Sequence, residues 1–287
     1  MIRRLFIFFL SFSLALPLTS CAKSKKWDVL SSEDQTILEK ILVHWETWVP
    51  ARKEDGTAPL MNFEELYQGL GEEEQRFLNR VRSIDPRKDF GFRGNFLGTD
   101  AGGVKFKRIK GQKILKNGKA EILGPQYLPQ EVFGAYKKMM KAMKHDLGKK
   151  LLVDSGYRSP AYQLYTFLYF MPKHHDSLVE TGHWVALPGY SEHGAPHRQA
   201  IDFINEEGVN GEDHPEDFEA LPEYEWLLEN ADRFGFKLSY PRAEKGIIPP
   251  PTFGPKGQLS SKAPPKAEKV GGGITFEPWH WRYSKGL

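Results

Sequence analysis

Hydrophobic residues first repeat along the chain with the spacing of an amphipathic helix. Between residues 33 and 49 the apolar positions that recur at helical intervals are Ile37, Ile41, Leu42, Trp45 and Trp48. Two serines at positions 31 and 32 precede this run and are suited to capping its N-terminus. A second helical pattern covers residues 62–84 and is interrupted at Gly69–Gly71. The stretch 31–120 is therefore expected to begin as a mostly helical region.

The pattern changes after residue 84. Residues 85–103 are rich in Gly, Asp and Arg and are predicted to be a loop. Two short alternating runs follow, separated by Asn117-Gly118, a dipeptide typical of tight hairpin turns. They predict a small sheet or a bridge between two halves of the chain.

Helical and strand-like segments alternate through the second half. Helices are expected from Pro129 to Gly148, over residues 160–171 and over residues 219–234. Strands are expected from residue 150 into a polar turn at 155–159, and over residues 235–240. Residues 241–273 are dense in Pro, Gly and Lys, which predicts a mobile loop between this strand and the last segment, 274–283.

The first twenty residues have the pattern of a secretory signal. Arg3 and Arg4 precede an apolar run over residues 5–18, which is shorter than the roughly 20 residues of a membrane span. The run leads through "LTS" into Cys21, which resembles a bacterial lipoprotein box in which that cysteine is lipidated. An ordinary signal with an incidental cysteine is the alternative. Cys21 is the only cysteine, so no disulfide can form within the chain, and residues 21–30 are expected to be a lipidated tether.

Charge and composition indicate a globular protein of low net charge. Without residues 1–20 the chain keeps 267 residues and loses two arginines, so its formal net charge falls from +3 to +1. A hydrophobic content of 40% with 27% charged residues is that of a globular protein, either one large domain or two small ones. Basic runs interleaved with aromatic residues are absent from the sequence, so no nucleic-acid partner is expected.

The segment "EPWHWRY", residues 277–283, places Glu277 and His280 among aromatic residues. Candidate partners lie in "LPGYSEHGAPHRQAIDFI", residues 187–204, which contains His193, His197 and Asp202. Histidine nitrogens and carboxylate oxygens ligate zinc, so His193, Asp202 and His280 would make a three-ligand site with Glu277 beside its water. Taken singly, each histidine is more often structural than metal-binding.

Glu277 and His280 would face opposite sides of a straight strand. The two residues can flank one metal only if the backbone turns between them. Pro278 is a reasonable cause of that turn, because its φ is fixed and it lacks an N–H donor.

Three motifs together resemble a known family. "SGYRS" at 155–159, "SEH" at 191–193 and "EPWHWRY" at 277–283 occur in the order found in the VanY-type D-alanyl-D-alanine carboxypeptidases, peptidase family M15. The resemblance covers roughly residues 125–287. It implies an α+β fold with a small antiparallel sheet and flanking helices, shared with the hedgehog signalling domain. The predicted boundaries are a helical N-terminal region at 31–120 and a zinc peptidase domain at 121–287.

Carried over residue by residue, the resemblance implies the roles of several side chains. The zinc ligands would be His193, Asp202 and His280. Glu277 would be the general base that takes a proton from the zinc-bound water and later gives it to the leaving amine. Arg158 would point at the scissile carbonyl or the developing oxyanion, and Gln163 and Ser191 would contact substrate. The remaining expected roles are a supporting carboxylate for a ligand histidine (Glu192) and aromatic shielding of the site (Trp279, Tyr283).

One spacing departs from the family pattern. Eight residues separate His193 from Asp202, where the family usually has six. A wider turn through "GAPH" would absorb the difference, or His197 would replace His193 as a ligand. Residues 171–186 look like an insertion. Its three histidines are expected at the rim of the site: His174, His175 and His183.

These features predict a lipid-anchored zinc peptidase of the cell envelope that releases terminal D-alanine from the stem peptide of peptidoglycan. Three alternatives stay open at this stage. Two share the chemistry: an L,D-carboxypeptidase and a peptidoglycan endopeptidase. The third is a non-catalytic lipoprotein that binds peptidoglycan or a partner protein, which the wider spacing before Asp202 would favour.

Overall fold

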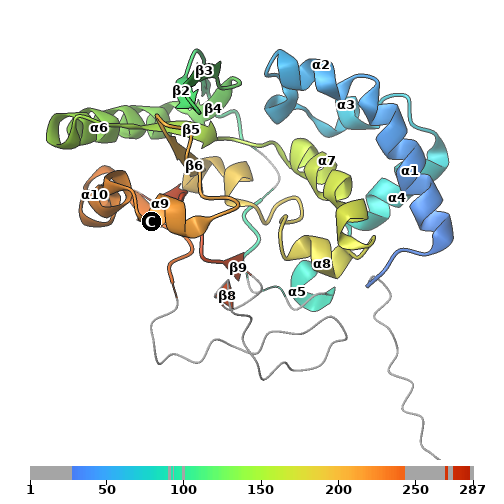
Figure 1. The fold of residues 1–287 in the computed structure, drawn as a ribbon. Coiled ribbons are helices and arrows are strands. Elements are labelled where there is room, and N and C mark those ends of the chain that lie inside the picture. Colours follow the sequence, from blue (N-terminus) through green and yellow to red (C-terminus); the bar gives the residue numbers. More distant parts are fainter. Residues whose placement is uncertain are drawn as a thin grey trace, which may run out of the picture.

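A computed structural model describes residues 28–89, 92, 94–98, 101–242, 269–270 and 274–284. The predicted signal and Cys21 lie outside the described residues, as do residues 243–268 of the predicted loop. Within the described ranges no helix has the length and apolar character needed to cross a bilayer. The fold is α+β, as predicted from the sequence (Figure 1).

The elements of the first half follow the predicted order with shorter helices. The helices are α1 (Ser32–Glu46), α2 (Val49–Glu54), the 3₁₀ turn η1 (Ala58–Leu60), α3 (Phe63–Tyr67), α4 (Glu72–Arg82) and α5 (Pro86–Asp89). The strands are β1 (Phe106–Ile109), β2 (Lys113–Lys116), β3 (Lys119–Ile122) and β4 (Gln126–Pro129). The Ser31 hydroxyl caps α1 by accepting a hydrogen bond from the Asp34 N–H at 3.1 Å. The predicted break at Gly69–Gly71 separates α3 from α4, whereas the predicted loop 85–103 contains α5.

The second half holds the remaining strands and helices. The helices are α6 (Gln130–Leu147), α7 (Pro160–Phe170), η2 (Met171–His174), α8 (Leu178–Gly182), η3 (Glu192–Gly194), η4 (Pro196–Arg198), α9 (Pro215–Glu219), α10 (Pro222–Asn230) and η5 (Ala231–Phe234). The strands are β5 (Leu151–Ser155), β6 (Ala200–Asn205), β7 (Phe236–Leu238), β8 (Lys269–Val270), β9 (Ile274–Thr275) and β10 (His280–Tyr283). The single helix predicted over 219–234 is thus three elements, and residues 269–270 of the predicted loop form a strand.

The central sheet is antiparallel with the strand order β5-β6-β10-β7. One face is covered by α6 and α10. The side chains that pack there include Met139, Leu227 and the β6 residues Ile201 and Phe203. On the other face, Ile114 of the β2–β3 hairpin packs on Leu152 and Ile204. Asn117 and Gly118 both have positive φ in the turn of this hairpin, as the dipeptide predicted.

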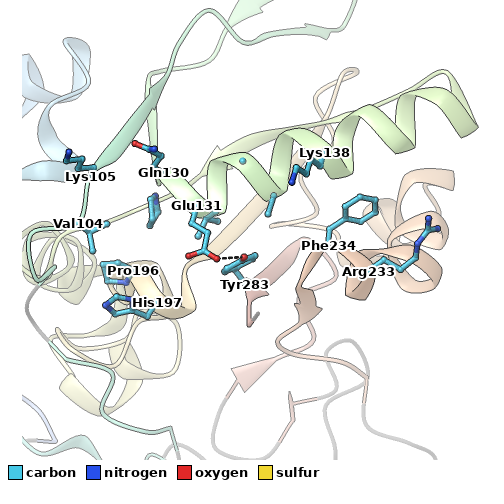
Figure 2. A pocket seen from close by; sticks show the side chains of 14 residues that line it. Val104, Lys105, Gln130, Glu131, Lys138, Pro196, His197, Arg233, Phe234 and Tyr283 are labelled. Carbon is cyan, nitrogen blue, oxygen red and sulfur yellow. Dashed lines mark hydrogen bonds between the residues drawn. The ribbon is translucent and has the colours of Figure 1, made fainter. Parts of the chain in front are cut away.

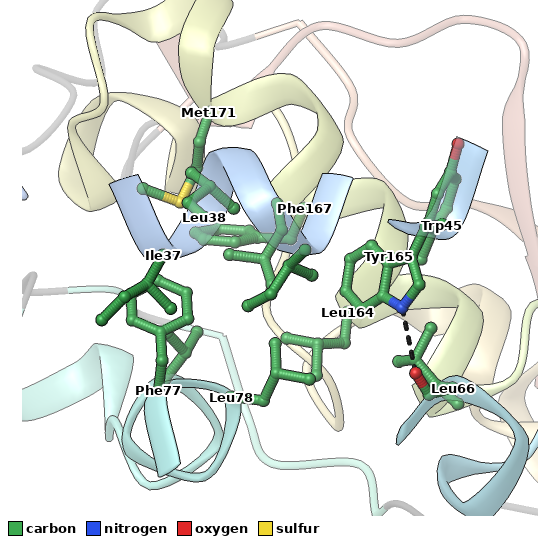
Figure 3. Packing of buried hydrophobic residues seen from close by; sticks show 14 of the residues in the cluster. Ile37, Leu38, Trp45, Leu66, Phe77, Leu78, Leu164, Tyr165, Phe167 and Met171 are labelled. Carbon is green, nitrogen blue, oxygen red and sulfur yellow. Dashed lines mark hydrogen bonds between the residues drawn. The ribbon is translucent and has the colours of Figure 1, made fainter. Parts of the chain in front are cut away.

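The N-terminal helices do not form a core of their own. One buried cluster combines side chains of α1, α3 and α4 with those of α7 and α8 (Figure 3). Phe167 of α7 and Trp45 of α1 are both buried in it, and the Trp45 indole donates to the Leu66 carbonyl at 2.9 Å. The shared core spans the boundary at residue 120 that we predicted between an N-terminal region and a peptidase domain.

The end of the predicted tether is attached to the fold. Val29 forms an isolated antiparallel bridge with Ser177, and the Leu30 N–H donates to the Asp176 carbonyl at 3.0 Å. Residues 28–30 therefore hold the segment between η2 and α8, which lies in the predicted insertion 171–186. Residues 21–27 of the tether lie outside the described residues.

The shared core predicts a large effect of a single substitution in α7. Phe167 is fully buried, so Phe167→Ala is expected to lower the free energy of unfolding by about 3–5 kcal/mol through lost burial and a cavity. The matched control is Val43→Ala on α1, whose side chain is 64% exposed and whose loss should change stability by less than about 0.5 kcal/mol. Urea denaturation measures both. Equal, small effects of the two variants would contradict the shared core.

Candidate metal centre

Strand pairing brings the central carboxylate and one imidazole together. In the antiparallel register of β6 and β10, His280 lies directly opposite Asp202. Asp202 sits in the middle of β6, where its neighbours Ile201 and Phe203 point into the core on the other face. The Asp202 carboxylate therefore faces away from α6, on the side of the sheet that carries the site. It is 8% exposed.

His193 is fixed by a backbone carbonyl. Its Nδ1 lies 2.7 Å from the Gly156 carbonyl oxygen, so Nδ1 carries the hydrogen and donates it. Position 156 itself needs a glycine, because a Cβ there would lie 2.4 Å from the Tyr127 carbonyl oxygen. The Arg158 N–H in turn donates to the His193 carbonyl at 3.1 Å. The "SGYRS" turn thus orients the histidine as well as carrying Arg158.

This tautomer leaves the other nitrogen of His193 with a lone pair. Nε2 is buried, lies 3.0 Å from Asp202 Oδ2 and makes no hydrogen bond. Burial, followed by the positive charge of Arg158, lowers the pKa of His193, which favours the neutral imidazole. A neutral nitrogen acceptor and a carboxylate oxygen then face each other at contact distance. This arrangement is destabilising unless a cation lies between them.

His280 completes the set. Its Nε2 donates to Glu192 Oε2 at 3.2 Å, and its Nδ1 lies 2.8 Å from Asp202 Oδ1. Burial opposes the charged form of His280, but the carboxylates of Asp202 and Glu192 outweigh it and raise its pKa to about 10. Burial likewise opposes the charged form of Asp202, while the two imidazoles hold its pKa well below the usual range.

These three residues fit a divalent metal ion. Ligand atoms of His193, Asp202 and His280 all lie within 4.8 Å of one another. Two imidazole nitrogens and a carboxylate oxygen are a donor set that zinc accepts. An ion at their centre would engage the lone pair of His193 and replace the proton between His280 and Asp202.

Glu192 forms a hydrogen bond with the candidate ligand His280. Besides the His280 nitrogen, its Oε2 accepts a hydrogen bond from the Ser239 hydroxyl at 2.5 Å. Arg282 lies 3.7 Å from the other carboxylate oxygen. Burial opposes the charged form of Glu192, but these partners, His280 foremost, lower its pKa. Such outer hydrogen bonds fix the orientation of a ligand histidine.

The two extra residues before Asp202 are accommodated in 3₁₀ turns. η3, which contains His193, and η4 follow each other before β6, with Ala195 as the residue between them. His193 stays with Asp202, whereas His197 is exposed and lines a different concavity (Figure 2). Of the two alternatives, the structure therefore favours His193 as the ligand.

The backbone turns between Glu277 and His280, as we predicted. Pro278 and Trp279 form the turn, and the His280 N–H donates to the Glu277 carbonyl at 3.1 Å. Glu277 Oε2 then lies 3.6 Å from His280 Nδ1, on the same side as Asp202. The side chain is 26% exposed, and burial raises its pKa to about 7, with Asp202 adding to the effect and His280 opposing it. A carboxyl group with this pKa can both accept and release a proton near neutral pH.

The predicted substrate-binding residues differ in burial and in hydrogen bonding. Arg158 is half-buried, and its Nε has no hydrogen-bond partner among the described residues. Gln163 is buried in α7, where its amide nitrogen donates to the Ala186 carbonyl at 2.7 Å and its Oε1 is unpaired within the described chain. Ser191 is the residue before η3 and is 9% exposed. Their contact with substrate stays a prediction.

One expectation about the surroundings was wrong. Trp279 and Tyr283 do not shield the metal centre, because both belong to the core on the α6 side of the sheet. The place of the insertion histidines at the rim of the site stays a prediction. Among them, the His174 ring stacks on Trp184, with ring centroids 6.0 Å apart.

Sequence reasoning missed Ser239 and Tyr240. Besides the bond from Ser239 to Glu192, the Tyr240 ring lies 4.9 Å from the His280 ring, and its carbonyl accepts the Glu277 N–H at 3.2 Å. Both follow β7 in a stretch that we predicted only as a strand. The strand order, which places β7 beside β10, was needed to find them.

Comparisons with known proteins find similarity to carboxypeptidases over part of the chain. Residues 125–248 match the family model described as VanY, D-alanyl-D-alanine carboxypeptidase. The chain is 34% identical over 105 residues to a D-alanyl-D-alanine carboxypeptidase of Enterococcus faecalis, covering 37% of this chain and 26% of that protein. It is 28% identical over 163 residues to the putative carboxypeptidase YodJ of Bacillus subtilis, covering 57% and 48% respectively. The chain thus spans less than two thirds of either relative.

Solved structures give similar matches. The LD-carboxypeptidase LdcB shares 25% identity at a TM-score of 0.39, covering 55% of this chain and 59% of that one. A mutant of the D,D-pentapeptidase VanY from a VanB-type vancomycin resistance cassette, in complex with Zn(II), shares 22% identity at a TM-score of 0.39, covering 64% and 80%.

The family match contains two of the three candidate ligands and ends before the third. His193 and Asp202 lie inside residues 125–248, whereas His280 of β10 and Glu277 in the segment before the turn reach them from outside that range. Residues 125–248 therefore resemble the VanY-type D-alanyl-D-alanine carboxypeptidases in sequence, and this likeness covers less than half of the chain.

Proposed function

We propose that this protein is a zinc-dependent carboxypeptidase that releases the terminal D-alanine of peptidoglycan stem peptides. The observation that carries the proposal is the buried pairing of Asp202 with two imidazoles, one of which presents an unpaired nitrogen. The family match supports the choice of a peptidase over a binding module. The spacing before Asp202, which had favoured a binding module, is accommodated by η3 and η4 without separating His193 from Asp202.

Each side chain has a defined task in this reaction. His193, Asp202 and His280 would hold the ion, which when bound supplies Lewis acidity and lowers the pKa of water. Glu277 takes a proton from the attacking water and delivers it to the departing amino group. Arg158 offers a guanidinium to the oxygen on which negative charge develops. Gln163 and Ser191 offer hydrogen-bonding groups to the substrate backbone.

The cellular location of the protein is part of the same proposal. The apolar run before Cys21 and the absence of other cysteines favour a lipid anchor in the cell envelope, where a stem peptide would be within reach. The proposed partners are therefore the stem peptide and the membrane that carries the anchor.

The ligand set predicts which histidine variant loses metal. His280→Ala is expected to reduce bound zinc from about one ion per chain to almost none, because one of three ligands is removed. His197→Ala, four residues from His193 but outside the set, should leave the zinc content unchanged. Elemental analysis after dialysis against zinc-free buffer compares the two. Loss of zinc from the His197 variant alone would replace the proposed set with the rejected alternative.

If Glu277 is the general base, its loss should reduce turnover without reducing metal binding. Glu277→Ala should lower kcat by about 10²–10⁴-fold, the usual worth of a positioned general base, while the zinc content stays at the wild-type level. The control is Glu216→Ala, an exposed carboxylate on α9 that should leave turnover unchanged. Mass spectrometry of a purified pentapeptide muropeptide follows the loss of one alanine. Full activity of the Glu277 variant would contradict the assignment.

The same assay separates the reaction types. Release of alanine from the pentapeptide supports the D,D-carboxypeptidase. Release only from a tetrapeptide indicates an L,D-carboxypeptidase, and cleavage within the stem indicates an endopeptidase. Either of the last two outcomes would overturn the proposed substrate while keeping the metal chemistry.

A further inference from the structure

A second concavity lies on the other side of β10 from the metal centre. It is a groove of about 1030 Å³ beside the N-terminal half of α6 (Figure 2). Tyr283 of β10 lines it, whereas Arg282 of the same strand points toward Glu192 at the metal centre. Successive side chains of a strand alternate between its two faces. The groove is therefore separate from the catalytic site.

The groove is positively charged. Lys105, Lys138 and Arg233 line it, and Glu131 is the only carboxylate among its lining residues. That carboxylate already accepts a hydrogen bond from the Tyr283 hydroxyl at 2.9 Å. Lys105 and Lys138 form no ion pair with any residue in the described ranges. Arg233 donates a hydrogen bond to the neutral Asn230 side chain at 2.7 Å and keeps its positive charge. The positive charge of all three side chains is thus available to an anionic ligand.

The positive side chains lie at two ends of the groove. Figure 2 shows Lys105 at one end and Lys138 with Arg233 at the other, with the Glu131–Tyr283 pair between them. On α6, positions 131, 134, 135 and 138 share one face. The two central positions are Gly134 and Ala135, and the space above Gly134 is open. Seven residues of helix span about 10 Å, so the floor suits an extended chain with separated acid groups.

We propose that this groove binds the carboxylate-bearing stem peptide of a neighbouring peptidoglycan strand, without cleaving it. The choice of this polymer rests on the proposed function, whereas the groove and its charge do not. Peptidoglycan presents many stem peptides on one scaffold, and each carries free carboxylates. Holding one peptide in the groove raises the effective concentration of the others at the metal centre. The groove therefore increases action on the polymer and is not needed for a single soluble peptide.

The test compares charge reversal inside and outside the groove. The groove variant carries Lys138→Glu and Arg233→Glu, both at exposed positions. The control carries Lys137→Glu and Lys141→Glu. These two residues lie on α6 outside the groove lining, and their substitution changes the net charge of the protein by the same amount. Both pairs are placed in full-length protein with Glu277→Ala, so that the wall is not digested, and sedimentation with insoluble peptidoglycan measures binding. The same pairs with Glu277 intact are assayed on one soluble pentapeptide.

We expect the groove variant to bind insoluble peptidoglycan about tenfold more weakly, the control to stay within about twofold, and soluble turnover to be unchanged in both. Equal weakening by the control would mean a general charge attraction and would overturn the proposal. So would undiminished binding of the groove variant, or equal binding to glycan strands stripped of their peptides. A wild-type protein that binds the wall through the groove but never releases alanine would refute the proposed peptidase and leave this site standing.

Discussion

The structure depends on one buried carboxylate placed between two imidazoles. Asp202 lies within 3.0 Å of His193 and 2.8 Å of His280. Removing such charges from water costs several kcal/mol per ion unless their partners are close and well oriented. Here the partners come from a 3₁₀ turn and from a strand 78 positions further along the chain. A fold that carries this cost for packing alone would be unusual, because apolar residues of similar volume stabilise a core at least as well.

The rest of the fold explains how this geometry is reached. Pairing of β6 with β10 sets the distance between Asp202 and His280, and the turn at Pro278 returns Glu277 to the same side. The "SGYRS" turn is held from several directions: the Tyr157 N–H donates to Tyr127, and the Ser159 N–H donates to the Pro59 carbonyl in η1. Through Pro59 and the core shared with α7, the N-terminal helices become part of the support of the site.

Much of the site was predictable because its residues carry their chemistry in short motifs. The order of these residues in the motifs predicted the candidate ligands His193, Asp202 and His280, and the fixed φ of Pro278 indicated the turn between Glu277 and His280. The hairpin at Asn117-Gly118 followed from the need for positive φ at both positions. These are local constraints, and a sequence expresses them locally.

The parts of the site and core that we did not predict depend on which strands and helices pack together across long distances in the sequence. Ser239 and Tyr240 reach the site only because β7 lies next to β10, and nothing in "GFKLSY" indicates this neighbour. Tyr283 and Trp279 were expected at the site because of their position beside His280, but alternation along β10 and the turn before it direct them into the core. The shared core of α1, α4 and α7 was missed for a related reason, since amphipathic patterns show which face of a helix is apolar but not which helix covers it.

A crystal structure of the zinc-loaded protein, with anomalous data collected at the zinc edge, would show directly whether His193, Asp202 and His280 bind one ion. We expect one strong anomalous peak within about 2.0–2.2 Å of His193 Nε2, His280 Nδ1 and an Asp202 oxygen. A peak on His174, His175 or His183 instead, with none beside Asp202, would contradict this expectation.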